Sequence, residues 1–144
     1  MKTAFISCSA SKLDRPTFAR NLYSPSTLFR FSLEYCLENY DKVYILSAKY
    51  GLVELDDVLE PYNLTLNKMS KFEIDNWALG VSKQILQKVS CENELFFHCG
   101  ERYRSVIKYL DSYKINCPMK GLGIGRQLGF YKKHLKNSSN LTLF

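Results

Sequence analysis

The fold is decided by the run VYILSAKYGL, residues 43–52. It begins with β-branched and aromatic residues, as a buried parallel strand does, and then changes to small, basic and aromatic residues. The same kind of change occurs in FISCSASK, residues 5–12, and in LFFHCGERY, residues 95–103. In open α/β sheets, ligands bind outside the carboxyl ends of such strands. The three runs therefore predict a polar pocket at one edge of a parallel sheet.

Helical patterns occupy the segments between these strands. Ser24 can cap a helix with Pro25 at its first position, and apolar residues then recur at helical spacing up to Tyr40. Ser70 and Glu73 form a capping box at the start of the clearest amphipathic helix. The other predicted elements are strands over 3–8, 42–48 and 94–99, helices over 101–113 and after 121–125, an extended piece over 115–119, and a long connection over 52–68.

Strands that alternate with helices predict a single α/β domain, with a three-layer open sheet that is mainly parallel and has helices on both faces. A chain of 144 residues is long enough for one domain with a real core. We place this domain at residues 1–136 and expect a frayed C-terminal tail over 137–144. Cys36 falls on the apolar stripe of the first helix, where a thiol acts as a small core hydrophobe.

Composition argues against several classes of protein. No apolar run approaches the roughly 18 residues that span a bilayer, and the first residues do not have the layout of a signal peptide. The five cysteines are widely spaced and the chain has only two histidines, which argues against a disulfide framework and against metal sites. We therefore expect a cytoplasmic protein that uses no membrane partner, no metal and no cofactor.

The net charge of +6 is concentrated in the last third of the chain. Residues 1–100 carry 11 Lys and Arg against 12 Asp and Glu, whereas residues 101–144 carry 9 against 2. A basic segment joined to a neutral one is typical of proteins that bind a polyanion, and it indicates nucleic acid before a membrane surface. A solubilising face is the alternative interpretation of the same charges.

The loop after the first strand offers Cys8, Ser9 and Lys12. A thiol and a hydroxyl can act as nucleophiles once a base activates them. Small residues followed by one lysine also suit phosphate, because backbone N–H groups form an anion nest and the ammonium adds charge. The loop lacks the glycines of a Walker A motif, so anion binding, nucleophilic catalysis and a plain turn all remain open.

The loop after the second strand repeats this chemistry with Lys49 and Tyr50. Lys49 can contact a phosphate or a carboxylate, and Tyr50 can stack on a base or pack in the core. Because Lys12 and Lys49 follow neighbouring strands, we expect them to share one site.

Glycines precede the last predicted helix. Gly123 and Gly125 allow the backbone to approach a ligand closely, although the third glycine of a dinucleotide signature is missing. Arg126 and Gln127, in the first turn of that helix, can reach a phosphate or a base edge. A flexible turn that enters a helix is the alternative interpretation.

Two further groups of residues are candidates by position. After the third strand, the helical spacing predicts that Tyr103 faces the core, which leaves Arg104 as the better candidate for binding a ligand. Asp56, Asp57 and Glu60 lie in the long connection, where loops often carry function. A solvated acidic loop is the other interpretation of these carboxylates.

Six motifs give the chain a wider resemblance. They are CSASK at 8–12, LYSPSTLFR at 22–30, ILSAKYGL at 45–52, PYNLTL at 61–66, GERYR at 100–104 and GLGIGRQL at 121–128. Together they resemble a family of small bacterial and phage proteins related to the peroxide-stress protein YaaA. A similar Cys-Ser-x-x-Lys element occurs, more distantly, in enzymes that modify deazapurine bases in RNA, whose cores resemble uracil-DNA glycosylases.

The resemblance implies that the partner is a nucleic acid or a nucleobase. It also implies an aspartate where this chain has Asn63. An amide cannot take up a proton as a carboxylate does, so either another carboxylate is the general base or the protein binds without catalysis. The carboxylates that remain as candidates are Asp56, Asp57, Glu60 and Glu101.

Our leading hypothesis is a glycosylase-like enzyme that acts on a nucleobase or its N-glycosidic bond, in a nucleic acid or a nucleotide. A tyrosine would stack on the displaced base, and a carboxylate would stabilise an oxocarbenium-like sugar or orient water. The alternatives are a non-catalytic nucleic-acid-binding stress or phage accessory protein, and a protein that binds or hydrolyses small nucleotides. The candidate catalytic residues are Cys8, Ser9, Asn63 and Asp57; the candidate binding residues are Lys12, Lys49, Tyr50, Gly51, Tyr62, Thr65, Gly100, Arg104, Gly123, Gly125, Arg126 and Gln127.

Binding to nucleic acid should weaken steeply with salt, because displaced counterions drive much of such affinity. Neutralising Lys132, Lys133 and Lys136 together should lower the affinity for an oligonucleotide and flatten its dependence on salt. Anisotropy titrations of a labelled oligonucleotide at several salt concentrations measure both effects. If no binding is detected at low salt, the basic segment is a solubilising face.

Overall fold

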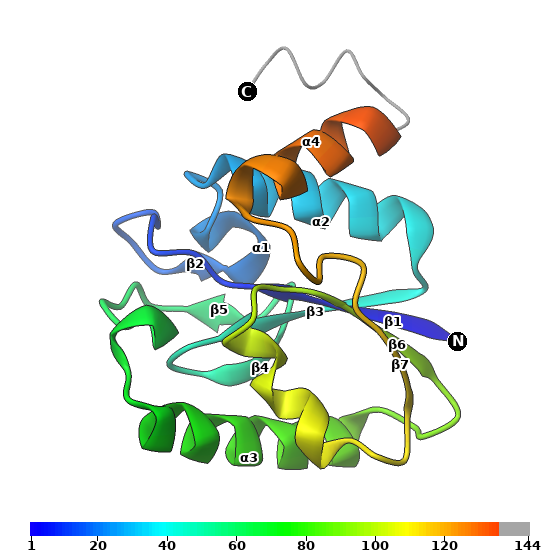
Figure 1. Cartoon of the computed structure of the whole chain (residues 1–144). Helices are drawn as coiled ribbons and strands as arrows, with labels where there is room; N and C mark the ends of the chain where they lie inside the picture. The colour runs from blue at the N-terminus through cyan, green and yellow to red at the C-terminus, as the bar shows by residue number, and fades with distance from the viewer. Residues whose placement is uncertain (136–144) are drawn as a thin grey trace.

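The computed structural model describes residues 1–135 and contains a central five-stranded sheet (Figure 1). Lys136 and the predicted tail over 137–144 lie outside the described residues. The strands lie in the order β4 (Gly51–Glu54), β3 (Lys42–Ser47), β1 (Lys2–Ser7), β6 (Glu94–His98) and β7 (Lys114–Asn116). β4 is antiparallel to β3, and all the other neighbours in this sheet pair in parallel.

Helices cover both faces of the sheet, which confirms the predicted three-layer, mainly parallel α/β fold of one domain. On one face lie α1 (Ala19–Leu22) and α2 (Thr27–Asn39), and α4 (Ile124–His134) packs against α2 (Figure 1). The other face carries α3 (Lys71–Lys88) and the 3-10 helix η2 (Tyr103–Tyr109). Within residues 1–135, no helix is long and apolar enough to cross a membrane.

Successive residues of β1 enter opposite cores, as expected of a strand that is buried on both faces. On the α3 side, the Phe5 ring stacks on those of Tyr44 and Phe97, with centroids 5.8 and 4.8 Å away. On the α2 side, Ala4 and Ile6 pack in the second core. All three β1 residues are fully buried, so the strand presents only its ends to solvent.

Both long helices begin at serine caps, but one begins later than predicted. Ser26, not Ser24, caps α2 with its hydroxyl. The prediction of Ser24 is wrong because the Ser24 carbonyl accepts a hydrogen bond from the Arg30 guanidinium, within a turn that precedes the helix. The capping box of α3 is confirmed, since Ser70 and Glu73 each accept the backbone N–H of the other.

Three other segments differ from their predictions. The helix predicted over 101–113 is the shorter η2, because the backbone leaves helical geometry at Leu110 before β7 begins at Lys114. The extended piece predicted over 115–119 is this strand, displaced toward the N-terminus. The predicted connection over 52–68 contains β4, β5 (Val58–Leu59) and the 3-10 turn η1 (Leu66–Lys68). β5 pairs with β2 (Thr17–Phe18) in a separate two-stranded sheet.

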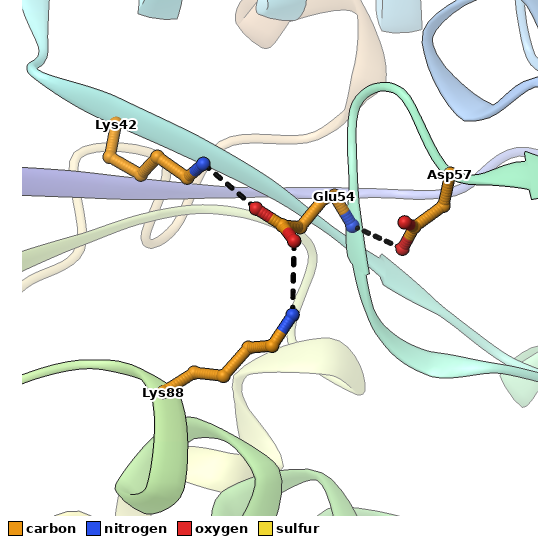
Figure 2. A network of polar contacts seen from close by, with 4 residues as sticks. All are labelled: Lys42, Glu54, Asp57 and Lys88. Carbon is orange, nitrogen blue, oxygen red and sulfur yellow. Dashed lines mark hydrogen bonds and ion pairs between the residues drawn. The ribbon is translucent and has the colours of Figure 1, made fainter.

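A network of charged side chains joins β3 and β4 to the end of α3 (Figure 2). The Glu54 carboxylate accepts hydrogen bonds from Lys42 at 2.9 Å and from Lys88 at 3.1 Å, and these partners lower its pKa. The Glu54 backbone N–H donates to the Asp57 carboxylate at 2.9 Å. Such exposed ion pairs contribute little stability. The network matters for position: the ion pairs hold Glu54 beside Lys42, and the backbone hydrogen bond from Glu54 keeps Asp57 close by, at the amino end of β3.

His98 is a buried polar side chain, 2% exposed, at the carboxyl end of β6. Its Nε2 lies 2.6 Å from the Tyr40 hydroxyl and its Nδ1 lies 2.9 Å from the Tyr131 hydroxyl. A neutral imidazole has one donor and one acceptor nitrogen, so one hydroxyl donates to the ring and the other accepts from it. Burial lowers the pKa of His98 from 6.5 to about 4.

The His98 pKa predicts a loss of stability in mild acid. Between about pH 6.5 and pH 4 the unfolded chain binds a proton that the folded chain excludes, so the free energy of unfolding falls as the pH is lowered. We expect a loss of about 2 kcal/mol between about pH 7.5 and pH 5, measured by urea denaturation. A His98→Gln variant should lose this dependence, and a variant of the exposed His134, His134→Gln, should keep it. Equal pH dependence in both variants would contradict the assignment.

Candidate functional site

The three predicted loops lie at one edge of the sheet. β1 pairs in parallel with β3 on one side and with β6 on the other, so the carboxyl ends of these strands lie side by side. This confirms the predicted common edge. The chain leaves β1 toward the α2 face and leaves β6 toward η2 on the α3 face (Figure 1). The gap between β1 and β6 is therefore the topological switch point, where open α/β sheets bind ligands.

A cavity of about 370 Å³, which we call the switch-point cavity, opens at this gap. The β1 loop contributes Cys8 and Ser9 to its lining, and the β6 loop contributes Gly100 and Tyr103. Other lining residues come from the start of α2, from η1 and the residue before it, from the β6 loop and from α4; they include Ser26, Thr65, Asn67, Glu101, Arg102, Ile124 and Gln127. A smaller inner cavity of about 60 Å³ adjoins it and reaches His98.

The Cys8 thiol forms part of the wall of this cavity. Its Sγ lies 3.2 Å from the Tyr103 hydroxyl and accepts the Ala48 N–H at 3.4 Å. Burial raises the pKa of Tyr103, so the phenol stays neutral at physiological pH. Within the described chain no carboxylate or imidazole hydrogen-bonds the thiol, and the Ser9 hydroxyl donates to the Ser11 carbonyl at 2.8 Å. The contacts needed to activate either group as a nucleophile are therefore not formed in this structure.

Ser47, at the end of β3, holds the adjacent turn together. Its hydroxyl oxygen accepts the N–H groups of Lys49 at 3.2 Å and of Tyr50 at 3.0 Å, and lies 2.8 Å from the Tyr62 hydroxyl. Its backbone carbonyl accepts the indole N–H of Trp77, whose ring meets Tyr103 edge-on. The side chain is completely buried, so these contacts replace water around it.

Lys12 lies beside this group of hydroxyls, not inside the cavity. Its ammonium stands 4.3 Å from the centre of the Tyr62 ring and donates to the Ala10 carbonyl at 3.3 Å. The Tyr62 hydroxyl lies 2.7 Å from that of Tyr23, and burial raises the pKa of Tyr23 to about 12. Burial also lowers the pKa of Lys12. Lys12 therefore packs as a partly buried cation on an aromatic face.

Lys49, Tyr50 and Gly51 form the turn from β3 into β4. Lys49 is exposed and faces the α3 side of the sheet edge, so neither it nor Lys12 lines the switch-point cavity. Tyr50 meets the Tyr62 ring edge-on, 5.5 Å between centroids, and donates its hydroxyl to the Glu60 carbonyl. Gly51 has φ +74°, a conformation that favours glycine. The structure thus explains these residues by the geometry of the turn.

The β6 loop places its two arginines differently. Arg104 is turned inward, and its guanidinium donates to the Cys99 carbonyl at 2.9 Å. Arg102 is exposed at the rim of the cavity, where it donates to the Asn67 side-chain oxygen at 3.2 Å. Sequence reasoning favoured Arg104 and did not single out Arg102 or Asn67. The motif GERYR contained the signal for Arg102, whereas Asn67 had none, because η1 brings it to the cavity.

The start of α4 contributes one buried side chain. Gly123 is the N-cap, and Gly123, Gly125 and Arg126 are exposed. Gln127 lines both the switch-point cavity and the inner cavity, and its amide N–H donates to the Leu122 carbonyl at 2.9 Å. The Gln127 side-chain oxygen accepts no hydrogen bond within residues 1–135, so it can receive one from a ligand.

The remaining candidates do not gather in one place. Thr65 lines the cavity and accepts the Asn67 N–H at 3.2 Å, whereas Asn63 is exposed outside the lining. Asp57 lies by Lys42, at the end of β3 that is opposite to the cavity. Of the carboxylates considered from the sequence, Glu101 is the one that lines the cavity. Within the described residues, no three His, Cys, Asp or Glu side chains are grouped as a metal site requires.

The buried hydroxyl of Ser47 should be important for stability. A Ser47→Ala substitution leaves two backbone N–H groups and the Tyr62 hydroxyl without their common partner, so we expect a loss of about 2 kcal/mol in the free energy of unfolding. Chemical denaturation measures this loss. Ser112→Ala, at an exposed position, is the control and should change stability by less than about 0.5 kcal/mol. Equal stability of the two variants would contradict the role given to Ser47.

Comparison with known proteins places the chain in a family without assigning it an activity. No curated protein and no solved structure matches it. A family model described as a family of unknown function, DUF6884, matches residues 3–133. Apart from Lys2 of β1 and His134 of α4, this match includes all the strands and helices described above, and it includes every loop that lines the switch-point cavity. The chain belongs to the DUF6884 family.

Proposed function

We propose that the protein is an enzyme that acts on a nucleobase or its N-glycosidic bond, and that the switch-point cavity receives the base. The observation that carries the proposal is the convergence of the β1 loop, the β6 loop and the start of α4 around one cavity at the switch point. Its volume of about 370 Å³ lies in the range of small-molecule sites. A base that is part of a nucleic acid must leave its stack to enter such a cavity.

The lining of the cavity supports recognition of a base edge. Amide side chains can donate and accept at once, which is how Asn and Gln read the edges of bases. Gln127 has a free acceptor oxygen inside the cavity, and Asn67 and Thr65 offer polar groups nearer the rim. Arg102 at the rim supplies a cation for a phosphate. In this proposal, recognition of the base depends on these lining residues rather than on Lys12 and Lys49, which lie outside the cavity.

Glu101 is the residue to which we assign the chemistry. A carboxylate beside the sugar can stabilise an oxocarbenium-like transition state or take a proton from attacking water. Glu101 is suited to this role because it lines the cavity, whereas Asp57 lies at the opposite end of β3. Asn63, which replaces the aspartate expected from the resemblance to YaaA-related proteins, would then not be required as a base.

The resemblance to YaaA-related proteins and to deazapurine-modifying enzymes supports the same class of substrate. Its most specific motif, SAKYGL at 47–52, forms the Ser47 turn. This motif therefore supports a common fold more strongly than a common reaction. The shared Cys8 and Gly100 elements support the site itself, since both line the cavity.

A nucleic-acid-binding protein without catalysis is the second candidate. It is favoured by one observation, which is that the Cys8 thiol and the Ser9 hydroxyl have no activating base among the described residues. In that case the same cavity would bind a base and release it unchanged. A protein that binds small nucleotides would use the cavity and leave the basic end of the chain without a role.

A Glu101→Gln variant separates these candidates. Incubation of plain and base-modified oligonucleotides with the wild-type protein should release free base, and the variant should be slower by about 100-fold or more, because an amide can neither take a proton nor stabilise a cation. Its binding affinity should change little. Glu92→Gln, at an exposed position just before the amino end of β6, is the control and should keep full activity.

Release of free base by the wild-type protein distinguishes an enzyme from a non-catalytic binding protein. If it binds the oligonucleotides and releases no base from any of them, the enzyme proposal is wrong and the non-catalytic candidate replaces it. If Glu101→Gln keeps the wild-type rate, the reaction uses another group.

A further inference from the structure

We infer that the substrate of the switch-point cavity is a single-stranded polynucleotide, and that a second cavity beside it holds the next nucleotide of the strand. This inference rests on the proposed function, since it takes the switch-point cavity as the site of the target base. The second cavity, which we call the side groove, has a volume of about 470 Å³.

The side groove lies between the start of α3 and η2. Met69 and Ile74 give it an apolar surface, and Lys71 lines it from the first turn of α3. It shares Glu101 and Arg102 with the switch-point cavity, so these two residues form a common wall. Two cavities with one wall between them match two successive nucleotides of a strand whose bases are splayed apart.

The lining of the side groove carries three cations against two carboxylates, one of which is Glu101 in the common wall, so its net charge favours a phosphodiester on the Arg102 side of that wall. Lys108 is paired with Asp75, which also accepts a hydrogen bond from Tyr109 at 2.6 Å, so the charge of that carboxylate is compensated. Lys71 and Arg102 are then the remaining cations of the groove. Within residues 1–135, the Arg102 guanidinium donates to the neutral side-chain amide of Asn67, which leaves its charge available to a phosphate.

The arrangement selects a single strand over the other forms of nucleic acid. In a duplex the neighbouring base is paired and stacked, so it cannot lie on Met69 and Ile74 while the target base fills the switch-point cavity. A free nucleotide carries its own phosphate and leaves the side groove empty. A single strand fills both cavities and places the linking phosphate by Arg102.

The test compares affinities for defined probes by calorimetry or competition. The probes are the four deoxynucleoside 5′-monophosphates, the corresponding single-stranded DNA and RNA tetramers, and a DNA duplex. The tightest tetramer should bind about tenfold or more tightly than its monophosphate, which is the size of one added charge-assisted hydrogen bond. The difference between the DNA and RNA tetramers identifies the kind of strand.

Two variants of exposed lysines on α3 show whether the side groove is responsible. Lys71→Glu should remove the advantage of the tetramer and leave the affinity for the monophosphate unchanged. Lys83→Glu makes the same change of charge three turns farther along the helix, outside the groove, and should retain most of the advantage. Circular dichroism of both variants checks that α3 is intact.

The outcomes separate this inference from the function on which it rests. Equal affinities for tetramer and monophosphate, equal effects of the two lysine variants, or a duplex that binds as tightly as the single strand would each overturn the inference and leave a base-directed site intact. A failure of every probe to bind at low salt would contradict the proposed function itself.

Discussion

The parallel pairing of β1 with both β3 and β6 is the constraint on which the rest of the structure depends. Phe5 stacks between Tyr44 and Phe97 on one face of the sheet, and its neighbours in β1 pack on the other. A slip of one residue would move Phe5 into the wrong core, so the register is strongly specified. Because the register is fixed, the strands end at the same level, and the Cys8 thiol meets Ala48 and Tyr103 from the two neighbouring loops. The cavity is thus a result of how the strands align.

The most specific sequence motif of the chain lies beside the cavity, whereas the residues that line the cavity belong to less specific patterns. SAKYGL at 47–52 forms a turn in which the Ser47 hydroxyl contacts three groups, one of them Tyr62 from a distant loop. These contacts hold the turn together whatever the ligand is. The side chains that line the cavity, and to which we assign ligand binding, are more ordinary: an amide at Gln127, an arginine at Arg102 and a carboxylate at Glu101.

Sequence reasoning recovered the parts of the fold that depend on regular patterns. The three apolar runs and the Ser70 capping box are local signals, and each predicted its element correctly. β4 could not be predicted, because its four residues become a strand only by pairing with β3 after the turn. The residues of the site also divide into those with a local signal in the sequence and those placed only by the fold. Cys8, in the loop after the first strand, and Gln127, in the first turn of the last helix, were candidates from the sequence and line the cavity. Asn67, by contrast, is brought to the cavity by η1, and Asp57 is held away from it by the Glu54 network. Neither position can be read from spacing along the chain.

The neutral state of His98 has a consequence for the direction in which a ligand enters. Its two tyrosine partners are neutral as well, because burial raises their pKa values. The lining of the inner cavity contains no Asp, Glu, Lys or Arg from the described residues, whereas Glu101 and Arg102 lie at the outer rim. Moving an unpaired ion from the rim to this neutral interior is costly. The site therefore has a polarity along its depth, which would orient a ligand with one ionic end and one uncharged end so that its uncharged end leads.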